Sequence, residues 1–217
     1  MKIIFDQVDK KFGIIYALKD VSFEIDQGEF VFITGNSGAG KSTLLKLILN
    51  QLKPSSGKVL LGEIDLSLGN KEEINQIRRK IGVVFQDYQL ISDKTIEENI
   101  ALILDIVNYP KEKIQSRIDQ VIKEVNLGTR RFLFPSQLAG GELQRAALAR
   151  ALAIEPEVIL ADEPTGNLDP ENSWNLVNLL KEINEKNNTT IIMTTHNNDI
   201  VESMDKRVIK LKEGEIL

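Results

Sequence analysis

The stretch GNSGAGKS, residues 35–42, decides the fold of this chain. It fits the pattern GxxxxGK[ST] of a phosphate-binding loop. An apolar run over residues 30–33 precedes the loop and a helical pattern over residues 43–48 follows it, so a strand passes into a helix at the required place. The backbone N–H groups of such a loop point inward, and the helix adds the positive end of its dipole. The sequence therefore predicts a nest that holds a polyphosphate.

Two side chains of this loop carry predicted roles of their own. Lys41 reaches the terminal phosphates as a mobile positive charge, and the Ser42 hydroxyl is a ligand of the Mg²⁺ that bridges them. The residues expected to bind the nucleotide here are Gly35, Asn36, Ser37, Gly38, Ala39, Gly40, Lys41, Ser42 and Thr43.

Composition excludes several classes of protein. The 217 residues suffice for a substantial core without cross-links, and the absence of cysteine excludes disulfides and thiolate metal sites. A net charge of −5 with no basic face argues against nucleic acid as a partner. No run approaches the roughly 18–20 apolar residues of a membrane-spanning helix. We therefore expect a soluble chain that can still dock on a membrane protein.

A second set of polar residues follows the predicted strand at residues 158–161. Asp162 and Glu163 come directly after it, at the strand end where ligands bind in open α/β sheets. Asp162 is predicted to hold Mg²⁺, through water, and Glu163 to polarise the water that attacks the γ-phosphate. His196 is the only histidine of the chain and follows the apolar strand at 189–194. A lone histidine is often incidental, but this position makes it a candidate for bonding the γ-phosphate.

The order of elements predicts an α/β fold. The first thirty residues read as antiparallel strands, and later apolar strands alternate with helices, which indicates a parallel sheet with crossovers. Thr95 and Glu98 fit a capping box at the start of a helix that Tyr109-Pro110 stops, and a second helix covers residues 114–125. The C-terminal segment 207–217 reads as a hairpin that turns at Glu213-Gly214.

Residues 137–150, QLAGGELQRAALAR, identify a family. Gly140 and Gly141 begin a helix that runs to about Ile154, which makes a second phosphate nest whose phosphate must come from elsewhere. Here the chain resembles the ATP-binding subunits of ABC transporters, whose signature LSGGQ closes over ATP held by the other subunit of a dimer. The resemblance implies one domain over residues 1–217. Its RecA-like core and antiparallel β subdomain take residues 1–86 and 156–217, and an inserted helical signature subdomain takes 87–155.

The resemblance also implies roles for individual residues. Phe12 stands at the adenine-stacking position, although it could as easily belong to the core. Gln86 of the Q-loop is a further metal and nucleotide contact, and Asp169 closes the D-loop. Glu163, His196 and Lys41 form the catalytic set, and Ser42, Gln86 and Asp162 the metal set. The signature residues expected on the nucleotide are Ala139, Gly140, Gly141 and Glu142.

Ala139 departs from the family, which usually has serine there. The substitution removes a hydroxyl expected to bond the γ-phosphate across the dimer, while the amides of Gly140 and Gly141 remain. Binding should weaken by about 0.5–1.5 kcal/mol, the worth of an ordinary hydrogen bond, or by somewhat more because the acceptor is charged. Fast turnover is therefore not expected.

Within the ABC proteins, residues 35–48, 86–96 and 160–169 most resemble the cell-division ATPases of the FtsE family. That resemblance implies a homodimer on ATP binding, an integral membrane partner of FtsX type and a place on the cytoplasmic face of the cell membrane. The alternative is the ATPase subunit of a lipoprotein or macrolide exporter, which shares the catalytic residues. A soluble ABC protein acting on DNA or ribosomes would need two cassettes or a coiled-coil insert, and the sequence has neither.

Overall fold

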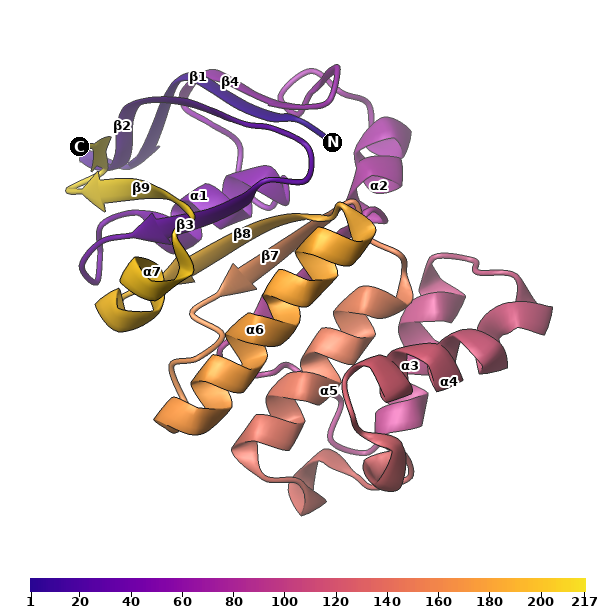
Figure 1. Cartoon of the computed structure of the whole chain (residues 1–217). Coiled ribbons are helices and arrows are strands. Elements are labelled where there is room, and N and C mark those ends of the chain that lie inside the picture. The colour runs from indigo at the N-terminus through magenta and orange to yellow at the C-terminus, as the bar shows by residue number, and fades with distance from the viewer.

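The computed structural model describes all 217 residues and contains two β-sheets with helices around them (Figure 1). The four-stranded sheet has the order β2-β1-β4-β5 and is antiparallel throughout. Its strands are β1 (Ile3–Phe12), β2 (Ile15–Ile25), β4 (Ser56–Leu61) and β5 (Ile64–Asp65). The expected antiparallel entry is confirmed.

The six-stranded sheet has the order β10-β9-β3-β8-β7-β6. Its strands are β3 (Phe30–Thr34), β6 (Ile81–Phe85), β7 (Val158–Asp162), β8 (Thr190–Thr195), β9 (Arg207–Lys212) and β10 (Glu215–Ile216). All neighbouring pairs run parallel except β9 and β10, which form the hairpin predicted at Glu213-Gly214. Both turn residues have positive φ, 51° and 85°.

The central strands β3, β7 and β8 are mostly apolar and turn polar only at their ends, because both faces of this sheet are covered. The short α1 (Lys41–Ile48) lies between the two sheets, and α5 (Gly140–Ala153) and α6 (Pro170–Asn187) lie on the opposite side of the six-stranded sheet (Figure 1). The other helices are α2 (Lys71–Arg78), α3 (Ile96–Ile106), α4 (Ile114–Glu124) and α7 (Asn198–Met204), with 3₁₀ turns at Lys111–Lys113, Gly128–Arg130 and Pro135–Gln137.

Alternation along β3 divides the apolar side chains between two cores. Val31 and Ile33 pack with α1 and the antiparallel sheet, whereas Phe32 packs with α3, α4, α5 and α6. The helices of residues 87–155 therefore share a core with the sheet instead of forming a separate globule. The subdomain boundaries at 86/87 and 155/156 stay a prediction.

Several elements differ from the sequence-based expectations. Helix α2 and strand β5 were not predicted, although Asn70 and Glu73 form a reciprocal capping box at the start of α2. The sequence pattern places the end of helix α1 near Asn50, whereas α1 ends at Ile48, and α3 ends at Ile106, before Tyr109. Strand β8 is shifted by one residue to Thr190–Thr195. No helix of the chain combines the length and the apolar character needed to span a membrane.

The capping box at the start of α3 is confirmed. The Thr95 N–H donates to Glu98 Oε2 at 2.7 Å, and the Glu98 N–H donates to Thr95 Oγ1 at 3.3 Å. The same helix end is tied to the segment before the signature, because Arg131 donates to both Glu97 and Asp119. This ion pair lowers the pKa of the Glu97 carboxyl from its ordinary value of 4.5.

We expect Arg131→Gln to lower the free energy of unfolding at pH 7 by about 1–2 kcal/mol, because a partly buried, hydrogen-bonded ion pair is lost. The Glu97 pKa is depressed on folding, so this contribution is present above pH 4.5 and is lost as the pH falls through the folded value. Urea unfolding at pH 7 and at pH 3 measures it. The difference from the parent should shrink in acid, whereas Arg78→Gln, at an exposed arginine of α2, should show no difference at either pH.

Candidate active site

The carboxyl ends of four neighbouring parallel strands meet at one edge of the six-stranded sheet. Strand β3 leads into the phosphate loop, β8 into His196, β7 into Glu163 and β6 into Gln86. A cavity of about 650 Å³ opens there. It is lined by Ala17, Asn36, Ser37, Gly38, Ala39, Gly40, Lys41, Ser42, Thr43, Gln86, Glu163 and His196. Ala17 was not predicted, because only the folding of β2 over the loop places it there.

The loop has the backbone of an anion nest. Gly38 and Gly40 have φ of 80° and 107°, and a Cβ on Gly40 would lie 2.5 Å from the Ala17 carbonyl oxygen. Gly40 is the N-cap of α1, no side chain caps that helix, and its first turn holds no acidic residue. The first N–H groups of α1 are therefore available to an anion, which the helix dipole favours.

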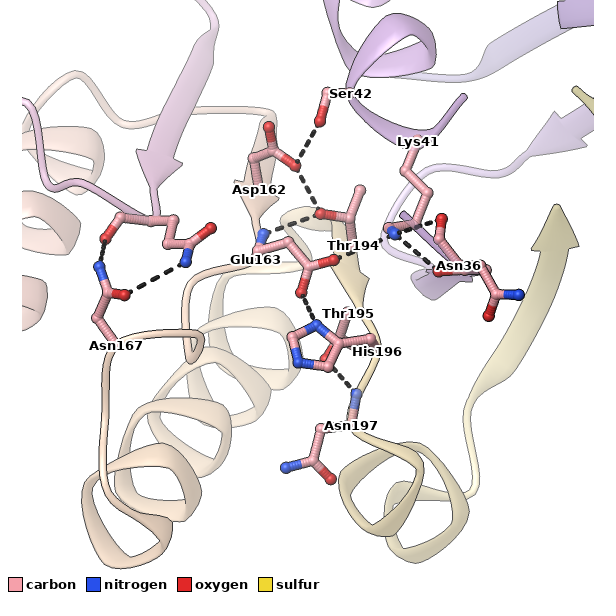
Figure 2. A network of polar contacts seen from close by, with 12 residues as sticks. Asn36, Lys41, Ser42, Asp162, Glu163, Asn167, Thr194, Thr195, His196 and Asn197 are labelled. Atoms are coloured by element: carbon pink, nitrogen blue, oxygen red, sulfur yellow. Dashed lines mark hydrogen bonds and ion pairs between the residues drawn. The ribbon is translucent and has the colours of Figure 1, made fainter. Parts of the chain in front are cut away.

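Lys41 is only 9% exposed and its ammonium group is well surrounded. Nζ donates to the carbonyl oxygens of Gly35 at 2.7 Å and Asn36 at 3.3 Å, and it lies 3.3 Å from Glu163 Oε1 (Figure 2). A charge removed from water needs such partners. The positive charge of the loop is thus held beside the carboxylate that the sequence nominates as the catalytic base.

Glu163 lies between two basic groups. Its Oε2 is 2.7 Å from His196 Nδ1, and its Oε1 faces Lys41 (Figure 2). Glu163 has a φ of 47°, which is uncommon for a non-glycine residue. Such backbone conformations cluster at active sites and ligand-binding sites. The His196 side chain is 71% exposed, whereas that of Glu163 is 17% exposed. The histidine therefore reaches from solvent onto a partly desolvated carboxylate.

Asp162 and Ser42 place oxygen ligands together. Asp162 Oδ1 lies 3.4 Å from the Ser42 hydroxyl and accepts a 2.7 Å hydrogen bond from Thr194 Oγ1. No group of three His, Cys, Asp or Glu residues is positioned to hold a metal by itself. Mg²⁺ is bound through one or two carboxylates with substrate phosphates and water, so a hydroxyl beside a single carboxylate fits it.

Gln86 is tied to the segment that follows Glu163. The Asn167 amide donates to the Gln86 carbonyl oxygen at 3.0 Å, and the Gln86 amide donates to Asn167 Oδ1 at 3.3 Å. A Cβ on Gly166 would lie 2.7 Å from Gln86 Nε2, so a side chain at 166 would displace this pairing. The Asp169 carboxylate, two residues after Asn167, accepts a hydrogen bond from the Asn172 N–H at the start of α6. That bond lowers the pKa of Asp169.

The signature residues lie apart from this cavity. Helix α5 begins at Gly140 with Ala139 as an N-cap that offers no side-chain acceptor. The Ala139 N–H donates to Glu142 Oε2 at 3.0 Å, and Arg130 bonds Glu142 Oε1 at 2.7 Å, which lowers the pKa of the Glu142 carboxyl. Neither these residues nor Asp169 line the cavity.

Phe12 is not a core residue. Its side chain is 51% exposed at the end of β1, and Lys10 Nζ lies 5.2 Å from the centre of its ring. It does not line the cavity either. Its part in adenine stacking stays a prediction.

A glycine-rich loop and helix N-terminus, two carboxylates and a histidine at the ends of parallel strands define a nucleotide hydrolase of the P-loop class. The family model described as "ABC transporter" matches residues 18–166. The chain belongs to the ABC transporter family of ATP-binding proteins and is an ATP-hydrolysing enzyme.

Individual proteins of that family are similar to this chain over most of its length. The chain is 45% identical over 203 residues to "Cell division ATP-binding protein FtsE" of Bacillus subtilis, covering 94% of this chain and 89% of that protein. It is 40% identical over 203 residues to "Methionine import ATP-binding protein MetN" of Vibrio vulnificus, covering 94% of this chain but 59% of that protein. A solved dimeric ATP-binding cassette in a post-hydrolysis state with ADP and Pi matches with a TM-score of 0.88 at 40% identity, covering 99% of this chain and 96% of that one.

We expect Lys41→Ala to lower the affinity for ATP by about 10- to 100-fold, because hydrogen bonds to a charged group are lost from a partly desolvated site. Calorimetric titration with ATP and Mg²⁺ measures the change. Lys58→Ala, at an exposed lysine of β4, is the matched control and should bind as the parent does. Equal affinity in both variants would place the phosphates elsewhere.

Proposed function

We propose that this chain is the ATP-binding and ATP-hydrolysing subunit of a bacterial cell-division system. It dimerises on ATP and drives a conformational change in an integral membrane protein of FtsX type, from the cytoplasmic face of the cell membrane. The observation that carries hydrolysis is the Glu163 carboxylate between Lys41 and His196. Similarity to the FtsE protein of B. subtilis over nearly the whole of both chains supports the cellular role. The ATPase subunit of a lipoprotein or macrolide exporter remains the alternative, since its catalytic residues are the same.

Residues that line the cavity, together with Asp162 beside Ser42, each have a separate part in hydrolysis. The N–H groups of the loop and Lys41 bind the β- and γ-phosphates, and Ser42, Asp162 and Gln86 would hold Mg²⁺, which neutralises charge on the phosphates. Glu163 accepts the proton of a water whose oxygen bonds the γ-phosphorus as the bond to the bridging oxygen breaks. His196 hydrogen-bonds the γ-phosphate. The products are ADP and phosphate.

In the proposed dimer, a second copy supplies the anion nest that the cavity of one chain does not contain. The glycine amides at the N-terminus of α5 form an anion nest, yet they are not among the cavity residues. A second copy can bring that nest to the γ-phosphate, as the dimeric form of the similar ATP-binding cassette suggests. Ala139 contributes no hydroxyl to this contact, so closure rests on backbone amides and the helix dipole.

An apolar cavity of about 370 Å³ offers a surface for the membrane partner. It lies beside β6, and its lining includes Phe85, Leu102, Ile103, Ile106 and Ala151. Ile106 is 58% exposed, and Phe85 immediately precedes Gln86. A partner seated here would therefore contact the strand that ends in the nucleotide site.

We expect Glu163→Gln to slow hydrolysis strongly while ATP binding persists, because the amide cannot accept the proton and the phosphate nest is untouched. Phosphate release and ATP titration separate the two effects. A parental rate of hydrolysis in this variant would remove Glu163 from its role.

The same variant tests the partner. Tagged Glu163→Gln protein, purified with ATP and Mg²⁺ from detergent-solubilised membranes, should retain an FtsX-type membrane protein, identified by mass spectrometry. Ile106→Asp in that background should lose it, and Leu68→Asp, at a residue that is 82% exposed elsewhere, should not. Recovery of an exporter permease instead would favour the alternative.

We expect Ala139→Ser to tighten the ATP-bound dimer by ~1.5–3 kcal/mol at most, the worth of one hydrogen bond to a charged group. Sedimentation of both proteins in the Glu163→Gln background, with ATP and Mg²⁺, measures it apart from turnover. The serine also completes a capping box with Glu142, worth about 1 kcal/mol to the monomer, so urea unfolding of the nucleotide-free chain is the control. Dimerisation at the same concentration would mean that Ala139 does not tune closure.

A further inference from the structure

Thr194 joins the two carboxylate residues of the active site although it belongs to the neighbouring strand. It is fully buried near the end of β8 and stands in direct register with Asp162 of β7. Its hydroxyl donates to Asp162 Oδ1 at 2.7 Å and accepts the Glu163 N–H at 2.8 Å (Figure 2). One side chain thus contacts the predicted metal ligand and the backbone of the predicted base.

Only a hydroxyl can make both contacts, since it donates and accepts at one atom. The residues before Thr194 in β8, Ile191, Ile192 and Met193, are apolar core residues. A buried threonine can also be a core residue whose hydroxyl is satisfied by the backbone, as Thr190 is at the other end of β8, where it accepts the Gly28 N–H at 2.9 Å. Thr194 differs because its second partner is a carboxylate of the site.

We propose that Thr194 is a positioning residue for both carboxylates. The Thr194 and Ser42 hydroxyls contact the same oxygen of Asp162, so together they fix the orientation of that carboxylate beside the phosphate loop. Partners that orient metal ligands in this way typically contribute 10- to 100-fold to metal affinity or activity. This role rests on the proposed Mg²⁺-dependent ATPase function.

Thr194 also holds the backbone of Glu163. The Glu163 N–H is shared between Thr194 Oγ1 at 2.8 Å and the Thr194 carbonyl oxygen at 3.2 Å. These bonds anchor a residue whose φ is 47°, a conformation that the surroundings must impose. Without the hydroxyl, the backbone at 163 can relax and carry the carboxylate away from Lys41 and His196.

The test compares Thr194→Val, which removes the hydroxyl at constant shape, with Thr194→Ser, which keeps it. A non-hydrolysable ATP analogue is titrated with Mg²⁺ and with EDTA, and steady-state hydrolysis gives kcat and KM. Thr194→Val should bind the analogue normally in EDTA, but the increase in affinity that Mg²⁺ produces should be about 10-fold smaller than in the parent. Its kcat should fall about 10- to 100-fold, with a smaller change in KM. Thr194→Ser should restore both.

Thr190→Val is the matched control, because it removes a buried hydroxyl with a backbone N–H partner from the same strand. It should alter stability but neither the Mg²⁺ gain nor kcat. A parental Mg²⁺ gain and kcat in Thr194→Val, or a serine variant as impaired as the valine one, would overturn the proposal. If Thr194→Val does not fold, Ser and Ala at 194 differ only in the hydroxyl and decide it. A parent without any Mg²⁺ gain would instead overturn the metal assignment of the site.

Discussion

The parallel register of β3, β8, β7 and β6 is the constraint on which the rest of the structure depends. Ile33, Thr194, Asp162 and Phe85 are paired in one row across these strands, so the residues that follow them emerge side by side. Burial on both faces fixes this register, because a slip by one residue would exchange the side chains of the two cores. Packing far from the nucleotide therefore determines how the catalytic groups meet.

The ion pair of Lys41 with Glu163 has a consequence for the order of events. Both carboxylate oxygens of Glu163 are engaged, Oε1 by Lys41 and Oε2 by His196. In the proposed mechanism, phosphate oxygens take over the Lys41 contact, which frees Oε1 of Glu163 to accept a hydrogen bond from water. The loop and the end of β7 thus exchange one charge interaction for another without leaving Lys41 unpaired in a buried position.

The sequence predicts the sheet and the phosphate loop well because both rest on local patterns: apolar strands, a glycine-rich turn and hairpin punctuation. Helix α2 is not predicted because its eight residues carry few apolar side chains and so show no clear helical periodicity. Its Asn70 N-cap is nevertheless recognisable in the sequence. Within the site, Lys41, Glu163 and His196 do converge, as their places at strand ends predicted. Thr194 and Ala17 could not be found in this way, because their roles come from pairing between distant segments, which no spacing along the chain reveals.

The nest at the N-terminus of α5 gives the proposed dimer its physical basis. Its amides carry part of a positive charge, and the carboxylate of its first turn, that of Glu142, bonds the Ala139 N–H and Arg130. In the proposed dimer, the γ-phosphate held by a second copy would be the anion that these amides bind. Because Ala139 adds no hydroxyl, we expect the closed state of that dimer to gain less from the phosphate than a serine signature would provide. We therefore infer a shallow closing equilibrium for the proposed dimer, which a membrane partner that prefers the closed form would shift with a modest difference in affinity.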